Sequence, residues 1–219
     1  MNLKQLRQHE MDQLKSDRRQ YIVTTALSVF KNNGIEQTTI QEIADASQVG
    51  VATVFRYFET KKQLVIEAAQ LLWESEYDTI ERYLPDGYET MSGLMQLRHV
   101  LLVFKYYYQN HPEVFRFLEQ FDNFVAKEHI SADELVLYEE RVLALQIPIL
   151  RAIQKGRHDQ TIRVDLDPDV LYFTLTHQLM SLISKLVLRG SILSSDLKVS
   201  GEAQIDLVLN MIIDYIRSK

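Results

Sequence analysis

Residues 51–58 of this 219-residue chain place polar and basic side chains on one face of a short predicted helix. Val54 and Phe58 lie one turn apart and are expected to point inward. The outward positions are then small, hydroxyl-bearing or basic: Ala52, Thr53, Arg56 and Tyr57. Small residues permit close approach, hydroxyls bond phosphates or base edges, and arginine reaches phosphate or guanine. The pattern favours DNA contact, although a helical hairpin with a solvated face has the same periodicity.

This helix is the second of two short predicted helices that follow a longer one. Ser16 is expected to cap the longer helix, and Gly34 is expected to end it. A capping box of Thr39 and Glu42 opens the first short helix, and residues 47–50 break it. Two short helices separated by about four residues, after a supporting helix, form a helix-turn-helix pattern. In that motif the first short helix braces the second in the major groove.

The rest of the chain also has helical periodicity. Residues 1–15 are polar and of mixed charge, and we expect either a mobile arm or a helical extension there. A capping box of Thr60 and Gln63 opens a fourth helix. Pro148 predicts a bend, and residues 162–165 are expected to form a loop. Further helices are expected at 90–110, 112–127, 132–156, 168–189 and 202–218.

Composition limits the class of protein. The chain has no cysteine, which excludes disulfides and thiolate metal sites. No apolar run reaches about 18 residues and the N-terminus lacks a signal-peptide core, so we expect a cytoplasmic protein without a membrane segment. The net charge is −6, but residues 1–62 carry nine Lys or Arg against seven Asp or Glu. Only that N-terminal end is therefore expected to dock on phosphates.

Residues 38–44, 49–58 and 60–64 resemble the DNA-binding signature of the TetR family of bacterial transcriptional regulators. They read TTIQEIA, VGVATVFRYF and TKKQL, in the order and spacing of that family. The resemblance covers about residues 17–70 and implies the following contacts with operator DNA: Thr38, Thr39, Gln41, Gly50, Val51, Ala52, Thr53, Phe55, Arg56, Tyr57, Lys61 and Lys62.

Three positions depart from the family pattern. Gln48 stands where glycine is usual, and a glutamine at positive φ would cost about 1 kcal/mol. Gly50 replaces the usual serine cap, a change worth a few tenths of a kcal/mol. Phe55 lacks the hydroxyl of the usual tyrosine. These departures leave the helix-turn-helix interpretation intact and affect the details of base preference.

The resemblance implies an all-α fold with two functional parts: an N-terminal three-helix helix-turn-helix domain, and a larger helical domain that binds a ligand and dimerises. The expected segments are an arm (1–15), the helix-turn-helix domain (16–62), a linking fourth helix (63–84) and the larger domain (85–219).

Aromatic residues are dense in the larger domain and on the linking helix. Rings of this kind line pockets for hydrophobic, aromatic or cationic molecules, but a helix–helix core has the same spacing. Because TetR-type proteins usually respond to small molecules, the resemblance implies an inducer site. Its candidate residues are Trp73, Tyr77, Phe104, Tyr107, Tyr108, Phe117, Phe121 and His177.

The last two predicted helices have wide apolar faces. Such surface exceeds what one neighbouring helix covers, which predicts contact with a second copy. The expected interface residues are Leu175, Leu179, Leu182, Leu186, Val208, Ile212 and Ile216. A two-fold dimer also suits a palindromic operator.

Sequence patterns of enzymes are absent. No acidic residue stands three positions before any histidine, so the Glu-x-x-His pattern of di-iron bundles is missing. Zinc-protease, phosphate-loop and nucleophile-elbow motifs are missing too. We therefore expect no catalysis, metal or cofactor. The prediction is a repressor that binds double-stranded operator DNA, a small-molecule inducer and a second copy. A regulator that activates transcription, or that acts through a protein partner, is the alternative.

Overall fold

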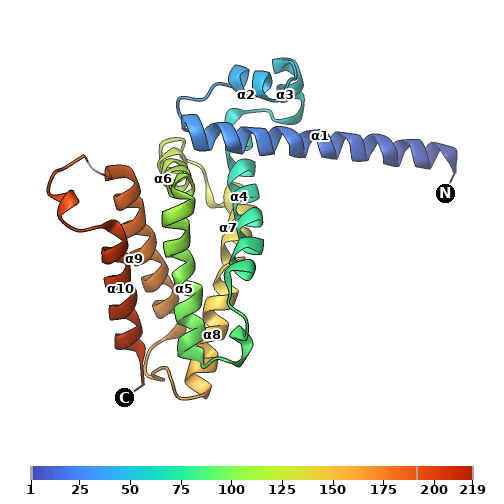
Figure 1. The fold of residues 1–219 in the computed structure, drawn as a ribbon. Coiled ribbons are helices and arrows are strands. Elements are labelled where there is room, and N and C mark those ends of the chain that lie inside the picture. Colours follow the sequence, from blue (N-terminus) through green and yellow to red (C-terminus); the bar gives the residue numbers. More distant parts are fainter. Residues whose placement is uncertain (1, 191, 219) are drawn as a thin grey trace. The chain divides into compact units, whose positions relative to one another are not determined.

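The computed structural model describes the backbone of residues 2–190 and 192–218, and their side chains except those of residues 3, 4 and 76–81. Among these residues the only β pairing is an isolated bridge between Ile162 and Arg217, so the predicted all-α fold is confirmed. The elements (Figure 1) are α1 (Leu3–Asn33), α2 (Ile40–Ala46), α3 (Val51–Tyr57), α4 (Lys61–Tyr83), η1 (Tyr88–Thr90), α5 (Gly93–Asn110), α6 (Pro112–Lys127), η2 (Ala132–Leu135), α7 (Val136–Ala144), α8 (Gln146–His158), α9 (Pro168–Arg189), η3 (Asp196–Lys198) and α10 (Gly201–Ile216).

The chain forms two compact units. The first contains residues 1–74 and 120–138, and the second contains residues 75–119 and 139–219. In the first unit, α2 packs on α1 and α3 packs on α2. Its core is formed by apolar side chains that are almost completely buried: Ile22, Ala26, Phe30, Ile35, Ile43, Ala44, Val54, Phe58, Leu64 and Leu72.

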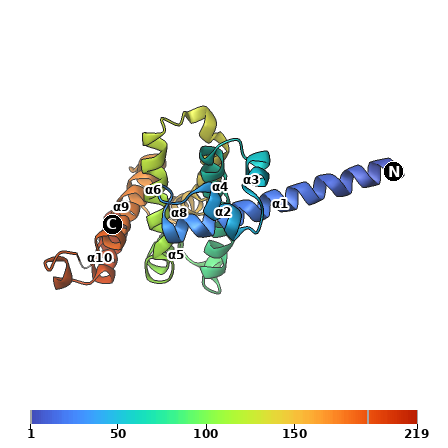
Figure 2. The same cartoon turned by 90° about the horizontal axis from the view of Figure 1, so that it is seen from above.

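Helix α1 is much longer than the sequence predicted. It begins at Leu3, so the expected cap at Ser16 is wrong, and Ser16 lies within the helix. The cap is Asn2, whose Oδ1 accepts a hydrogen bond from the Gln5 amide at 2.8 Å, while Gln5 Oε1 accepts one from the Asn2 amide at 2.9 Å. The N-terminal residues therefore form the helical extension, and in both views α1 projects well past α2 and α3 (Figures 1 and 2).

The predicted helix 132–156 is divided. A 3-10 turn, η2, precedes α7, and the chain breaks again at Leu145 before α8. We expected Pro148 to bend a continuous helix, and this was wrong. Pro148 is the third residue of α8 and lies in its first turn. In the first turn of a helix a missing N–H costs nothing, since these amides have no intrahelical acceptor.

The second unit is organised around α5. This helix packs against α8, α9 and α10, and its closest approach is to α8 at two glycines. A Cβ added to Gly93 would lie 1.9 Å from the Gly156 nitrogen and 2.6 Å from the Ala152 carbonyl oxygen. The Gly93 amide also donates to Asp159 Oδ2 at 2.8 Å. The crossing thus depends on backbone-to-backbone contact that any side chain would prevent.

Helix α9 is apolar enough to require comment. Among the described residues, α9 is the one helix whose length and composition would allow it to cross a membrane. Only 33% of its most apolar stretch is buried inside the chain. Length and composition alone are weak evidence for a membrane segment, because helices of protein cores and interfaces meet the same criteria.

Candidate nucleic-acid interface

Helix α3 presents the outward face that the sequence predicted. Val54 and Phe58 are buried, at 0% and 1% exposure. Phe55 is 49% exposed, and the Arg56 side chain is exposed with its guanidinium 5.4 Å from the centre of the Tyr57 ring. Ala52 is also exposed, while Val51, Thr53 and Tyr57 are half-buried. An aromatic ring, a guanidinium and small residues therefore share one accessible surface.

Helix α2 begins with the predicted capping box. The Glu42 carboxylate accepts hydrogen bonds from the Thr39 amide at 2.7 Å and from the Thr39 hydroxyl at 2.9 Å, and these bonds lower the pKa of Glu42. Exposed Gln41 donates to Asp45 Oδ1 at 2.8 Å. Thr38 departs from expectation. It is 1% exposed and its hydroxyl donates to the Gly34 carbonyl at 2.7 Å, so it supports the turn and is not available to DNA.

The two lysines at the start of α4 are occupied within the first unit. Lys61 Nζ lies 3.4 Å from the Glu36 carbonyl oxygen, and partial burial lowers its pKa. Lys62 forms an ion pair with Glu134 of η2. Contacts with Lys62 and with the Ser131 amide lower the pKa of Glu134 to about 2. A phosphate contact by either ammonium group would require exchange of these internal contacts.

Arg19 is a positioning residue that the sequence interpretation missed. Its guanidinium donates to the carbonyl of Tyr57 at the end of α3 and pairs with Glu67 of α4. It also lies 4.4 Å from the centre of the Phe58 ring. Burial raises the pKa of Glu67. One signal in the sequence was available. Arg19 lies one helical turn before the apolar residue Val23, so its side chain is directed to the same, inward side of α1.

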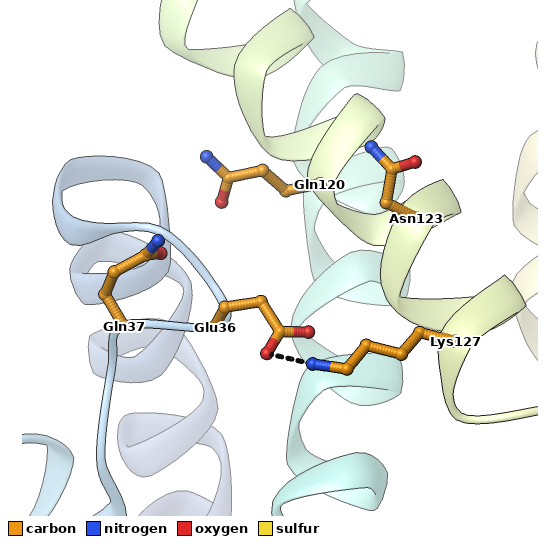
Figure 3. Close-up of a pocket in the computed structure, with 5 residues that line it drawn as sticks. All are labelled: Glu36, Gln37, Gln120, Asn123 and Lys127. Atoms are coloured by element: carbon orange, nitrogen blue, oxygen red, sulfur yellow. Dashed lines mark hydrogen bonds and ion pairs between the residues drawn. The ribbon is translucent and has the colours of Figure 1, made fainter.

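A polar cavity of about 290 Å³ lies beside the loop that joins α1 to α2 (Figure 3). Its lining is Glu36, Gln37, Gln120, Asn123 and Lys127. Lys127 Nζ donates to Glu36 Oε2 at 2.8 Å, and this contact lowers the pKa of Glu36. Gln120 Oε1 accepts a hydrogen bond from the Ile35 amide at 2.8 Å. The loop before α2 is thereby held to the second half of α6 within the first unit.

Gln48 occupies the turn between α2 and α3 with φ of 54°, a conformation that favours glycine. We expect Gln48→Gly to stabilise the protein by about 1 kcal/mol, because it removes the steric cost of a Cβ at positive φ. Thermal denaturation followed by circular dichroism measures this gain. The matched control is Gln48→Ala, which keeps the Cβ and should give no gain. A Gln48→Gly variant that melts below Gln48→Ala would contradict the expectation.

The expected ligand-binding residues are divided between the two units. Trp73 and Phe121 belong to the first unit. The second unit contains half-buried Phe104 and Tyr108 and buried Tyr107 and Phe117, as well as His177. His177 is exposed and stacks on Phe173 at 5.8 Å between ring centres, so it is not part of an interior site. The side chain of Tyr77 lies outside the described residues.

The expected dimer residues need correction as well. Leu175, Leu179, Ile212 and Ile216 are at most 6% exposed, so they belong to the chain's own core and are not available to a second copy. Leu182, Leu186 and Val208 are half-buried. The large apolar side chains that α9 and α10 leave exposed occupy other positions: Val170, Phe173, Leu188, Leu207, Met211 and Tyr215.

Comparison with known proteins agrees with this geometry. Residues 22–68 match the family described as bacterial regulatory proteins, tetR family. The chain is 27% identical to the HTH-type transcriptional repressor KstR2 of Mycolicibacterium smegmatis over 167 residues, which cover 72% of this chain and 73% of that protein. It is 35% identical to the probable acrEF/envCD operon repressor of Escherichia coli over 85 residues, which cover 39% and 38% of the two chains.

The fold is also found among solved structures. The transcriptional regulator FadR from Bacillus subtilis, in complex with stearoyl-CoA, superposes with a TM-score of 0.59 and 14% identity, over 89% of this chain and 97% of that one. These relatives regulate transcription, in agreement with the prediction that the chain is not an enzyme. By this match, residues 22–68, from α1 to α4, form a DNA-binding domain of the tetR family of bacterial regulatory proteins, and the chain is similar to transcriptional repressors over 72% of its length.

Proposed function

We propose that the protein is a cytoplasmic repressor that binds a palindromic operator as a homodimer and leaves it when a small molecule binds to the second unit. The observation that carries the DNA-binding part is the accessible face of α3. There Phe55 and Arg56 are exposed, while Val54 and Phe58 anchor the helix in the core. A guanidinium and an aromatic ring at this position can contact guanine and thymine in the major groove.

Dimerisation is supported by apolar side chains that the chain leaves uncovered. Leu207, Met211 and Tyr215 are 60%, 59% and 62% exposed, and their spacing of four residues aligns them along one side of α10. Val170 of α9 is also 66% exposed. Contiguous apolar surface of this kind marks association sites. A two-fold pair would present two copies of α3 to a symmetric DNA site.

Release by a small molecule is supported by the aromatic content of the second unit and by the neighbouring structures. FadR, which shares the fold, is described in complex with stearoyl-CoA. In this chain Phe104, Tyr107, Tyr108 and Phe117 lie on α5 and α6 at half-buried or buried positions. Rings of this type bind apolar molecules. We therefore propose an apolar inducer for the second unit.

Selection of genomic DNA fragments tests the proposal. The protein is expected to enrich a two-fold symmetric sequence, and Arg56→Ala should bind the recovered fragment at least about tenfold more weakly, since one base contact is worth about 1–3 kcal/mol. Gel-shift titration gives both affinities. A sequence without two-fold symmetry would contradict the dimeric operator complex.

Arg151→Ala is the matched control, because it removes the same charge from an exposed position of α8 in the second unit. Its affinity should equal that of the unchanged protein. Equal affinities for Arg56→Ala and Arg151→Ala would refute DNA recognition by α3. The recovered fragment also identifies the neighbouring genes, from which candidate apolar inducers can be chosen.

A further inference from the structure

The N-terminal extension of α1 has no role in the arrangement described so far. Residues 5–18 are exposed and continue, as one helix, into the buried part of α1. The extension from Leu3 to Arg18 is about 24 Å long at about 1.5 Å per residue. It is an unbroken helix, and in both views it projects beyond α2 and α3 (Figures 1 and 2).

The charges of the extension are separated around its axis. With about 3.6 residues per turn, Arg7, Lys15 and Arg18 fall within about 80° of one another. All three side chains are exposed, and among the described residues none has an ion-pair partner. The acidic side chains of the extension lie outside that arc: Glu10, Asp12 and Asp17. We call the side formed by Arg7, Lys15 and Arg18 the basic face.

Two of these acids are held by amides. Gln8 Nε2 donates to Asp12 Oδ1 at 3.0 Å, and Gln13 Nε2 donates to Asp17 Oδ1 at 2.8 Å. The bond to Gln13 directs Asp17 away from the basic face, and the bond to Gln8 occupies the carboxylate of Asp12 beside it. A helix surface with one sign of charge is complementary to a regular row of phosphates.

The direction of the basic face follows from the buried part of α1. Arg18 and Lys15 lie one and two turns before Ile22, on the same side of the helix, and Ile22 is fully buried in the core of the first unit. Ile22 lies at one edge of the buried side, because buried Ala26, Phe30 and Val23 follow about 40–100° further round the helix. The basic face therefore borders the side of α1 that faces this core. Arg19, the next residue, is bonded to the Tyr57 carbonyl, so the extension leaves the unit beside the last turn of α3.

We infer that the basic face contacts the phosphate backbone of the DNA that flanks the sequence bound by α3. This inference rests on the proposed DNA-binding function and extends it to a second set of residues. The extension, at about 24 Å, matches about seven base pairs of duplex. Its contacts are with phosphates, so they add affinity and salt dependence without base preference.

The test compares two triple variants of the full chain. One replaces the basic face (Arg7→Ala, Lys15→Ala, Arg18→Ala). The control replaces three neutral, exposed residues on the opposite side of the same helix (Ser16→Ala, Gln20→Ala, Thr24→Ala). Each is titrated, over a range of salt, against the recovered fragment cut to its symmetric core and against the same fragment with about seven added base pairs on each side. Circular dichroism and sedimentation verify fold and oligomeric state.

The unchanged protein and the control should bind the longer fragment more tightly. The basic-face variant should lose this gain and bind both fragments alike. For three phosphate contacts per extension and two extensions per dimer, the slope of log affinity for the longer fragment against log salt should fall by about 5.4. The loss of affinity for the longer fragment between about 50 and 200 mM salt is then about 2,000-fold smaller for the variant.

A simple effect of net charge would weaken binding to both fragments equally, so that result would overturn the inference. An unchanged salt slope would overturn it too. If the basic-face variant altered sedimentation and left DNA binding intact, the extension would pair with a second copy instead, and the inference would be wrong. Failure of the unchanged protein to bind the core fragment would refute the proposed function itself, which separates the two cases.

Discussion

Gly93→Ala is expected to lower the melting temperature by about 6–12 °C, corresponding to about 3 kcal/mol of lost stability. The new Cβ would lie 1.9 Å from the Gly156 nitrogen and 2.3 Å from its Cα, and both atoms are backbone. No side-chain rotation can relieve such a contact, so α5 and α8 must separate. Their separation also strains the hydrogen bond from the Gly93 amide to Asp159. Thermal denaturation followed by circular dichroism measures the loss.

Gly50→Ser is the matched control for this change. A Cβ at Gly50 meets no atom within 4 Å, and its φ of −72° suits any residue. Serine at the N-cap of α3 also gains a side-chain cap, so stability should be unchanged or slightly higher. Gly93→Ala melting at the temperature of Gly50→Ser would show that α5 and α8 do not cross as closely as described.

Arg19→Ala is expected to weaken operator binding at least about tenfold and to destabilise the protein by about 2 kcal/mol. The substitution leaves the half-buried Glu67 carboxylate without its cation and removes a hydrogen bond to the Tyr57 carbonyl. It also removes the cation above the Phe58 ring. The recognition helix would lose the bond that fixes its last turn to α1. Gel-shift titration and chemical denaturation measure the two effects.

Two further variants separate charge from geometry at this position. Arg19→Lys keeps the charge but lacks the planar fork that reaches Tyr57 and Glu67 together, so it should resemble Arg19→Ala in DNA affinity. Gln20→Ala changes the next residue, which is exposed, and should behave as the unchanged protein. Full DNA affinity in Arg19→Lys would mean that charge alone is needed here.

Helices with polar or proline signals at their ends could be predicted closely. Pro112 begins α6, and Pro168 begins α9 after Asp167, whose carboxylate accepts from the amides of Asp169 and Val170. The Thr39 capping box begins α2 as expected. In each case the signal is local, because the capping bonds join residues within three positions of each other.

The extension of α1 could not be recognised by the same means. The few apolar side chains before Ile22 do not mark a packed helix, because no other element covers them and Leu6, Met11 and Leu14 are exposed. Its cap, Asn2 with Gln5, lies at the extreme N-terminus, where we expected either a mobile arm or a helical extension. The break at Leu145 has no glycine or proline at that position to signal it. Without a visible break, Pro148 was expected to lie inside one continuous helix, whereas it lies in the first turn of α8.

Burial of particular side chains was the least predictable part of the site. Thr38 and Thr39 are adjacent hydroxyl residues, yet only Thr38 turns inward to the Gly34 carbonyl. On α10, Ile212 and Met211 are neighbours, and only the first is buried. Apolar residues on more than one face of a helix do not indicate which face meets the chain's own core. That choice depends on neighbours distant in sequence.

The position of Trp73 has a practical consequence. It is the only tryptophan of the chain, it lies on α4 two residues before the second unit begins, and its indole nitrogen is buried. Indole emission responds to solvent and to nearby polar groups, so intrinsic fluorescence reports from a single known point next to the border between the units. We expect that binding of DNA or of an inducer can thus be followed in the unlabelled protein. Because the sequence has no cysteine, a single cysteine introduced at a chosen position would also allow a dye to be attached there alone.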